Sequence, residues 1–305
     1  MISPVATLVI PTKNRWPDLQ RALQSALKQT VPLEIIVLDD GSTDGSAVKV
    51  KEAYPQIRLI VCEGPSRGPT VRRNQGVELA STPIVFSMDD DAELVSPRTI
   101  EQTLAEFDEP RVGIVGIPYI DVQKDQVVRQ RTPETSRIML SEAFVGAAYA
   151  VRRAPYLAVG GYREQWFQYG EEGDLSIRML ARGYVVRLGR ADPVHHHESP
   201  RRHVGRMLAL YRRNDVLFAW HNVPWPAFPM HLLGTTLKGL WFGLRAGCLW
   251  SSAKGIAKGY ADIFRYWSKR VPVPRAVYRL SRRLRKQGPL ALDSIQAELP
   301  ALNTG

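Results

Sequence analysis

The sequence predicts an α/β protein in which an open, mostly parallel sheet flanked by helices is followed by a helical extension. In the first 200 residues, short apolar segments alternate with amphipathic helical patterns, which is typical of consecutive βα units. These segments are apolar on both faces, like strands that helices cover on both sides. The balance of acidic and basic residues changes after residue 200. Residues 201–305 hold 18 Lys and Arg but 4 Asp and Glu, a net of +14, so the first 200 residues contribute −3 to the overall +11.

Hydrophobic periodicity gives the expected elements. Between residues 18 and 29, for example, Leu19, Leu23 and Ala26 recur at helical spacing. The expected strands are 7–10, 34–38, 58–62, 84–88, 112–117, 127–131 and 184–188. The expected helices are 18–29, one that starts at Ser46, 69–80, 97–107, 153–159, 171–181 and 202–220.

Three parts follow from this pattern. Residues 1–200 form the α/β domain, because 305 residues with 44% hydrophobic content suffice for one large core plus an appendage. Residues 201–290 form a basic, Trp-containing helical extension. Residues 291–305 have little pattern, and we expect a disordered tail there.

The basic extension indicates an anionic partner. Apolar residues, tryptophans and regularly spaced Lys and Arg occupy 231–267, which suits helices lying on an anionic membrane surface. A packed subdomain with a solvated basic face explains the pattern equally well. Nucleic acid is a weaker partner, because no recognised binding motif accompanies the charge.

We expect no signal peptide, because the first residues lack a basic start, and no window reaches the ~18 apolar residues that a membrane-spanning helix needs. Cys62 and Cys248 lie far apart, which favours a reducing compartment over a disulfide framework. We therefore expect a cytoplasmic protein, peripheral on the inner face of the membrane where its extension meets lipid.

Acidic residues follow two expected strands at the edge of the sheet where ligands bind. Asp89, Asp90 and Asp91 repel one another unless a cation or hydrogen bonds compensate them, and a hard divalent ion takes such oxygen ligands. A solvated turn is the simpler interpretation of an isolated triplet, but its position favours a ligand site. Asp39, after the second strand, can accept hydrogen bonds from a nucleobase or ribose, while Asp44 caps the next helix.

Two further clusters carry candidate chemistry. Glu171, Glu172 and Asp174 open a helix, where the macrodipole favours acids, but one of them can also serve as a general base. His195 and His196 follow the last strand of the domain and can complete a metal shell begun by the acidic triplet. Because neighbouring side chains in an extended segment alternate in direction, they cannot both bind one ion easily.

Together these motifs resemble a family 2 glycosyltransferase with the Rossmann-like GT-A fold, over residues 4–200. The motifs, in chain order, are Pro11-Thr12-Lys13-Asn14-Arg15, Val37-Leu38-Asp39-Asp40-Gly41-Ser42, Arg72-Arg73-Asn74, Met88-Asp89-Asp90-Asp91, Gly170-Glu171-Glu172-Gly173-Asp174 and Val194-His195-His196. Each is moderately specific alone, and the set in this order is strongly specific.

The resemblance implies roles for these residues. Those expected to bind the donor are Pro11, Thr12, Arg15, Asp39, Asp40, Arg73, Asp89 and Asp90. Those expected to hold Mg²⁺ or Mn²⁺ are Asp91, Asp89, His196 and His195, with His196 favoured over His195. The family's base is usually the Asp of a Glu-Asp pair, whose position Glu172 occupies here, so Glu171 and Asp174 stay open as alternatives.

The implied reaction is transfer of a hexosyl or deoxyhexosyl group, with inversion, from a UDP-, dTDP- or GDP-linked donor to an acceptor hydroxyl. The acceptor would be a glycan or a lipid-linked sugar in cell-surface polysaccharide or glycolipid assembly. Two alternatives remain: a sugar-nucleotide pyrophosphorylase, which would normally show a Gly-rich loop after the first strand, and a catalytically inactive nucleotide-sugar-binding membrane scaffold.

Overall fold

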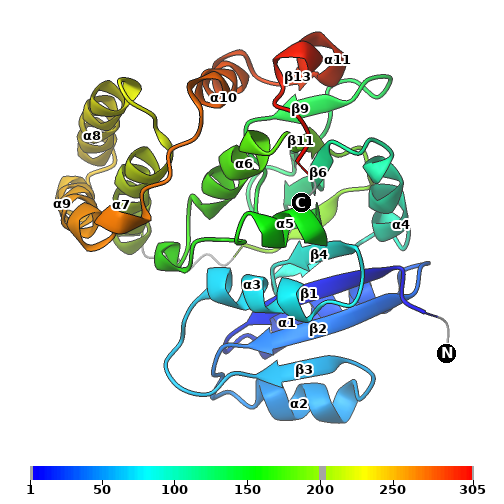
Figure 1. Ribbon diagram of the computed structural model, residues 1–305. Coiled ribbons are helices and arrows are strands. Elements are labelled where there is room, and N and C mark those ends of the chain that lie inside the picture. The colour runs from blue at the N-terminus through cyan, green and yellow to red at the C-terminus, as the bar shows by residue number, and fades with distance from the viewer. Residues whose placement is uncertain (1–2, 199–203, 304–305) are drawn as a thin grey trace.

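The computed structural model describes residues 3–198 and 204–303, which form two sheets surrounded by helices (Figure 1). The large sheet contains, in spatial order, β13 (Leu290–Ala291), β9 (Met139–Ser141), β11 (Val185–Leu188), β6 (Val112–Gly116), β10 (Ala148–Arg152), β4 (Ile84–Met88), β1 (Ala6–Thr12), β2 (Leu33–Asp39) and β3 (Arg58–Val61). The small sheet contains β5 (Ala92–Glu93), β12 (Val194–His196), β7 (Tyr119–Asp121) and β8 (Val128–Arg129).

The helices largely follow the predicted periodicity. Those of the first 198 residues are α1 (Trp16–Ala26), α2 (Ser46–Ala53), α3 (Pro69–Leu79), α4 (Thr99–Leu104), η1 (Ala105–Phe107), α5 (Arg153–Ala158), η2 (Glu164–Trp166) and α6 (Glu171–Ala181). Those of the C-terminal region are α7 (Val204–Asn222), α8 (Ala227–Arg245), α9 (Leu249–Arg265), η3 (Trp267–Lys269), α10 (Arg275–Gln287), α11 (Leu292–Ile295) and η4 (Gln296–Glu298). Residues 202 and 203 of the long predicted helix lie outside the described part of the chain.

The predicted parallel sheet is present. β4, β1, β2 and β3 are parallel neighbours, so their carboxyl ends meet at one edge. Helices cover both faces, and β1 shows why: Leu8 and Ile10 pack into one core cluster, whereas Val9 packs into the cluster on the other face. On that second face α3 lies so close that a Cβ on Gly76 would be 2.3 Å from Val9 Cγ1.

The other half of the large sheet is mixed. β10, which the sequence pattern did not predict, lies antiparallel between β4 and β6, and β11 pairs with β6 in parallel. β10 therefore joins the two halves. Its sequence, Ala-Tyr-Ala-Val-Arg, contains one β-branched residue, which explains the weak strand signal.

The C-terminal region differs from the prediction at its end. The sequence predicts a disordered tail over 291–305, but residues up to 303 have defined positions. β13 pairs antiparallel with β9, and Ile295 and Leu299 pack beside Leu140 in a third core cluster. These few apolar residues form no periodic pattern of their own, because they complete a core built by other elements. Within 3–198 and 204–303, no helix is both long and apolar enough to cross a bilayer.

Candidate active site

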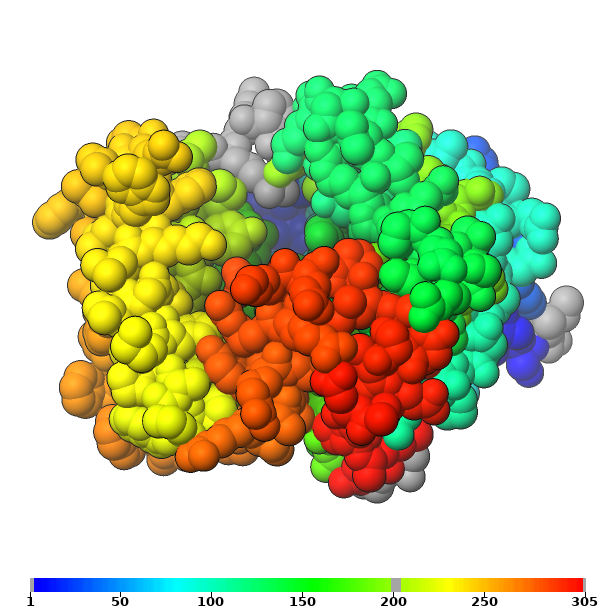
Figure 2. Space-filling view, turned by 90° about the horizontal axis from the view of Figure 1, so that it is seen from above, coloured from blue at the N-terminus to red at the C-terminus, as the bar shows by residue number. Residues whose placement is uncertain are grey.

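The strand ends predicted to converge do meet. From the segment after β1, Arg15 Nη1 lies 3.0 Å from Asp90 Oδ1 and Arg15 Nη2 lies 2.8 Å from Asp91 Oδ2, while Thr12 Oγ1 donates to Asp90 at 2.8 Å. Figure 2 shows the surface hollowed between the helices of the C-terminal region and the green segment, with residues of the blue N-terminal region at the floor. The acidic triplet thus shares one site with Thr12 and Arg15.

A possible cation site lies at the end of β4. One ligand atom each of Asp89, Asp91 and His196 lies within 4.8 Å of the others. The second sheet brings the histidine there, because β12 pairs antiparallel with β5, the strand that follows the acidic turn, with His196 opposite Ala92. Carboxylate and imidazole ligands suit a divalent ion such as Mg²⁺ or Mn²⁺.

His196 is oriented as a metal ligand would be. Its Nδ1 lies 2.6 Å from Asp121 Oδ1, while its buried Nε2 has no hydrogen-bond partner among the described residues and lies 3.4 Å from Asp91 Oδ1. A carboxylate that holds one ring nitrogen leaves the other directed at a cation. The sequence analysis missed Asp121, which reaches His196 only because β7 runs parallel to β12.

The three adjacent carboxylates concentrate negative charge at this site. Burial raises the pKa of Asp90 to about 7. Burial acts in the same direction on Asp91, but His196 and Arg15 hold the pKa of Asp91 well below its usual range. Although burial opposes a charged imidazole, Asp91 raises the pKa of His196 to about 9. A proton and a guanidinium therefore balance carboxylates that a divalent ion can neutralise instead.

His195 lies away from this cluster. In β12 it alternates with His196, and its ring approaches that of His197 with centroids 6.4 Å apart. His197 Nε2 lies 3.0 Å from Glu93 Oε2. The structure thus gathers His196 with the acidic triplet and directs its two neighbours elsewhere.

Asp39 and Asp40 have different surroundings although they are adjacent. Asp39 Oδ1 accepts from the Ser42 amide at 2.7 Å, but its buried Oδ2 has no partner in the part of the chain that the structure describes. Asp40 accepts four hydrogen bonds, from Ser66 Oγ, the Arg67 and Gly68 amides and Arg72 Nε. These bonds outweigh burial and hold the pKa of Asp40 low. Asp40 therefore fixes the loop before α3, which differs from its expected donor-binding role.

Two other predicted residues contribute at this edge. Pro11 is buried in β1 opposite Leu38 of β2, next to the Thr12–Asp39 pair. Asp44 Oδ1 accepts from the Ser46 amide at 3.0 Å at the start of α2, but Gly45, and not Asp44 as expected, occupies the N-cap position.

Arg73 connects the acidic triplet to the acids of α6. Its buried guanidinium pairs with Asp89 and lies 3.5 Å from Glu171 Oε1, and Arg73 Nη2 also donates to the Gly146 carbonyl. The positive charge thus sits between two carboxylates that are far apart in the sequence.

Glu171 and Glu172 flank this arginine. Burial raises the pKa of Glu171 to about 8, and its Oε2 has no hydrogen-bond partner within the described ranges. Burial also raises the pKa of Glu172, which is partly exposed. A Cβ on Gly146 would lie 2.7 Å from Glu172 Oε1 and 3.4 Å from the Arg73 guanidinium. Glycine at position 146 therefore leaves room for the Glu172 carboxylate beside Arg73.

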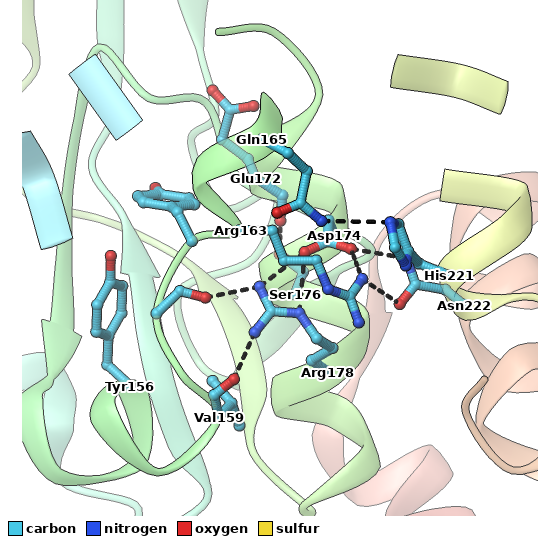
Figure 3. Close-up of polar contacts among 12 residues, drawn as sticks. Tyr156, Val159, Arg163, Gln165, Glu172, Asp174, Ser176, Arg178, His221 and Asn222 are labelled. Carbon is cyan, nitrogen blue, oxygen red and sulfur yellow. Dashed lines mark hydrogen bonds and ion pairs between the residues drawn. The ribbon is translucent and has the colours of Figure 1, made fainter. Parts of the chain in front are cut away.

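Asp174, the third candidate base, is enclosed by partners (Figure 3). It forms an ion pair with Arg163, accepts from Arg178 Nε at 2.9 Å and accepts from Asn222 Nδ2 at 2.8 Å. These charges outweigh burial and lower the pKa of Asp174. Figure 3 also shows Glu172 directed away from this group. Asp174 thus links α6 to α7 and is not available to a substrate.

Residues 7–158 match the family profile described as "Glycosyl transferase family 2". The chain belongs to glycosyltransferase family 2. This assignment fits the order of its acidic motifs and confirms the family that the sequence indicates.

Similar proteins agree with this assignment. The chain is 37% identical over 29% of its length to "Uncharacterized glycosyltransferase YibD" of Escherichia coli, and it spans about a quarter (26%) of that relative's length. It is 26% identical over 78% of its length to the N-acetylglucosaminyl-diphospho-decaprenol L-rhamnosyltransferase of Mycobacterium tuberculosis, of which it covers 91%. Among solved structures, the mannosyltransferase PcManGT from Pyrobaculum calidifontis, in complex with GDP-Man and Mn²⁺, superposes with a TM-score of 0.60. The match has 22% sequence identity and covers 85% of this chain and 76% of that chain, which supports the GT-A fold.

In this glycosyltransferase the C-terminal region supports the loop before α6. Phe167 and Tyr169 adopt positive φ angles of 59° and 73°, which are costly for large side chains. Asn214 of α7 is buried, and its amide nitrogen donates to the backbone carbonyls of Trp166, Gln168 and Tyr169 at 2.7–3.2 Å. The loop that leads into Glu171 and Glu172 is therefore fixed from outside the α/β domain.

Proposed function

We propose that this glycosyltransferase moves a hexosyl or deoxyhexosyl group from a nucleoside-diphosphate sugar to an acceptor hydroxyl with inversion at the anomeric carbon. One observation carries the proposal: Arg73 pairs with Asp89 of the candidate cation site and contacts Glu171 beside the candidate base. Donor diphosphate and acceptor hydroxyl would therefore meet within one site, which is what a single displacement requires.

Asp39 suits recognition of the nucleobase. Its buried Oδ2, which lacks a partner among the described residues, is an acceptor that loses hydrogen bonding unless a ligand donates to it. Uracil, thymine and guanine each present a ring N–H, so the three donor classes UDP-, dTDP- and GDP-sugar fit this acceptor. Pro11, Thr12 and Arg15 lie at the same strand edge.

Asp89, Asp91 and His196 would hold Mg²⁺ or Mn²⁺. The orphaned Nε2 of His196 and the two carboxylates are the donor set that such an ion prefers. When bound, the ion supplies positive charge that stabilises the departing diphosphate. Asp121 keeps His196 in the orientation required.

Glu172 is the proposed general base. It takes the proton of the acceptor hydroxyl while that oxygen forms a bond to the anomeric carbon and the bond from this carbon to the diphosphate oxygen breaks, its electron pair leaving with the nucleoside diphosphate. Attack from the face opposite the leaving group inverts the configuration. A carboxylate whose pKa burial has raised is a better proton acceptor than an exposed one.

The acceptor that we propose is a lipid-linked or glycan hydroxyl in polysaccharide or glycolipid assembly. The Mycobacterium tuberculosis relative is named for a diphospho-decaprenol acceptor. The surface of α8, α9 and the following turn also exposes large apolar side chains, namely Met230 (72%), Trp241 (56%), Trp250 (81%), Phe264 (76%) and Trp267 (61%). Together with the basic charge, this suits peripheral binding to an anionic membrane from the cytoplasmic side.

A donor panel tests the reaction. We expect hydrolysis or transfer with one nucleotide sugar, lost on addition of EDTA and restored by Mn²⁺. Metal-independent turnover would contradict the cation site, and binding without turnover by any donor and acceptor would favour the inactive scaffold. Cosedimentation with phosphatidylglycerol vesicles, compared with phosphatidylcholine vesicles and with DNA, tests the membrane proposal.

A further inference from the structure

A pocket of about 310 Å³ lies between α7, α9 and the loop before α6. Its apolar walls come from Phe167, Ala209 and Leu210, and its basic side chains include Arg206, Lys254 and Lys258. The volume falls at the lower end of the ~300–1,000 Å³ typical of small-molecule sites. An apolar interior with basic groups around it suits a molecule that carries both an alkyl chain and an anion.

Three of the four basic groups around this pocket have no acidic partner among the described residues. Arg206, Lys254 and Lys258 form no ion pair with any described residue. Lys254 and Lys258 are four residues apart on α9, so two like charges occupy one face of the helix, an arrangement that is unfavourable by itself. Arg213, at the inner side, is instead committed to Asp262 and the Gln165 carbonyl. The three outer cations are therefore positioned to meet an anion from outside the chain.

Phe167 connects the pocket to the loop before α6. The Phe167 carbonyl accepts from Thr70 Oγ1 at 3.0 Å, and its ring occupies the space beside Gly68, where a Cβ would lie 2.7 Å away. Four residues later the chain reaches Glu171. A ligand in the pocket would thus contact the segment that positions the proposed base.

The exposed face of α9 extends this arrangement. Trp250 lies one helical turn before Lys254, and Phe264 lies near the end of α9 on the same side of the helix as Trp250. Trp250 and Phe264 are among the most exposed apolar residues in the described part of the chain. An alkyl chain leaving the pocket on this side would meet apolar surface.

We propose that this pocket binds the phosphate and the adjoining isoprenoid segment of a polyprenyl-phosphate-linked acceptor. The proposal rests on the proposed function, because it places the lipid of the acceptor beside the loop that leads into α6 and Glu172. Arg206, Lys254 and Lys258 neutralise the phosphate, and the apolar wall of Phe167, Ala209 and Leu210 takes the first part of the chain.

The test uses the full chain and farnesyl diphosphate, a soluble isoprenoid phosphate, in calorimetric titrations without donor. We expect binding by the wild type and at least about tenfold weaker binding by Lys254→Ala/Lys258→Ala, since hydrogen bonds to charged groups are lost. The matched control is Arg279→Ala/Lys286→Ala, which removes two exposed charges from α10 and should bind like the wild type.

Several outcomes would overturn the proposal. One is that the wild type does not bind farnesyl diphosphate, and another is that the wild type and the α9 variant bind it with equal affinity. A third is that the wild type binds inorganic pyrophosphate as tightly as farnesyl diphosphate, which would mean that the apolar wall contributes nothing to binding. If the α9 variant loses binding to anionic vesicles but binds farnesyl diphosphate like the wild type, the lysines contact bilayer headgroups instead. Mn²⁺-dependent binding of the nucleotide-sugar donor is measured on the same samples. If it fails in the wild type, the proposed function is wrong, whereas failure of farnesyl diphosphate binding alone removes only the pocket assignment.

Discussion

Two groups of carboxylates in this molecule look alike in sequence but differ in what surrounds them. Asp40 and Asp174 are saturated by arginines and amides, so their charges are fully compensated within the chain. Asp39 and Glu171 each keep a buried oxygen without a partner among the described residues, and the nearby His196 keeps a nitrogen in the same state. Burial of unsatisfied polar atoms is costly and persists where a ligand supplies the missing bonds. This difference distinguishes acids whose bonds stabilise the fold from acids that we propose bind a substrate or stand beside the base.

Glu172→Gln should give the largest effect, because Glu172, next to Glu171 at the start of α6, is the proposed general base. The amide keeps the size of the side chain but cannot take a proton, so we expect the transfer rate to fall by about 10²–10⁴-fold while Mn²⁺-dependent donor binding is retained. Initial rates and calorimetry on the same preparation measure both. Glu171→Gln is the matched control. A large loss there with normal transfer by Glu172→Gln would move the base to Glu171.

Asp174→Asn tests the saturated group. Arg163 and Arg178, which are largely but not fully buried, would lose their counter-charge, so we expect a loss of about 3–5 kcal/mol in the free energy of unfolding, measured by urea denaturation. Glu298→Gln, which breaks an exposed pair with Arg283, should change stability little. A stable Asp174→Asn variant that lacks transfer activity would instead return Asp174 to the catalytic candidates.

His221, which lies beside Arg163 and Asp174, should make the stability of the fold depend on pH. Burial first, and the charge of Arg163 next, lower the pKa of His221 to about 4, from an ordinary value near 6.5 in the unfolded chain. The unfolded state therefore binds a proton at His221 more readily than the folded state does. The free energy of unfolding is then highest above pH 6.5 and falls by up to about 3 kcal/mol as the pH falls toward 4. Unfolding of the wild type and His221→Gln across pH 4–8 measures this. Parallel curves would refute it.

Asp121→Asn should have the smallest effect. Asp121 touches only His196 Nδ1 among the proposed metal ligands, and loss of such a supporting carboxylate typically lowers metal affinity about 10–100-fold. Mn²⁺ titration followed by electron paramagnetic resonance provides the measurement, with Asp125→Asn on the neighbouring exposed turn as the control. Unchanged affinity would show that His196 is not a ligand.

Local patterns predicted much of the fold. The strand 84–88 and the helix 171–181 have the expected bounds, and the convergence of Arg15 with Asp90 and Asp91 follows from parallel strand order. β10 and three strands of the small sheet were missed, whereas β8 lies within the expected strand 127–131. β5, β7 and β12 have only two or three residues, which leaves too short a pattern to detect.

The candidate site was predicted in residue type more than in role. The sequence shows that Asp40 and Asp174 are acids, but their partners come from positions as distant as Arg72 and Asn222, and no local pattern reports such contacts. Asp121 and Asn214 were missed for the same reason, since each acts through a neighbour that only the tertiary structure supplies. The roles assigned to Glu172, Asp39 and His196 stay predictions for the experiments above.

The contact of Asn214 with the loop at 166–169 sets a lower limit on the length of a working enzyme. A fragment cut at residue 200 would retain every acidic motif and yet lose the amide that keeps Phe167 and Tyr169 in their costly backbone conformations. Transfer activity should therefore survive trimming from the C-terminus only while α7 is intact, because Asn214 of this helix holds the loop in place.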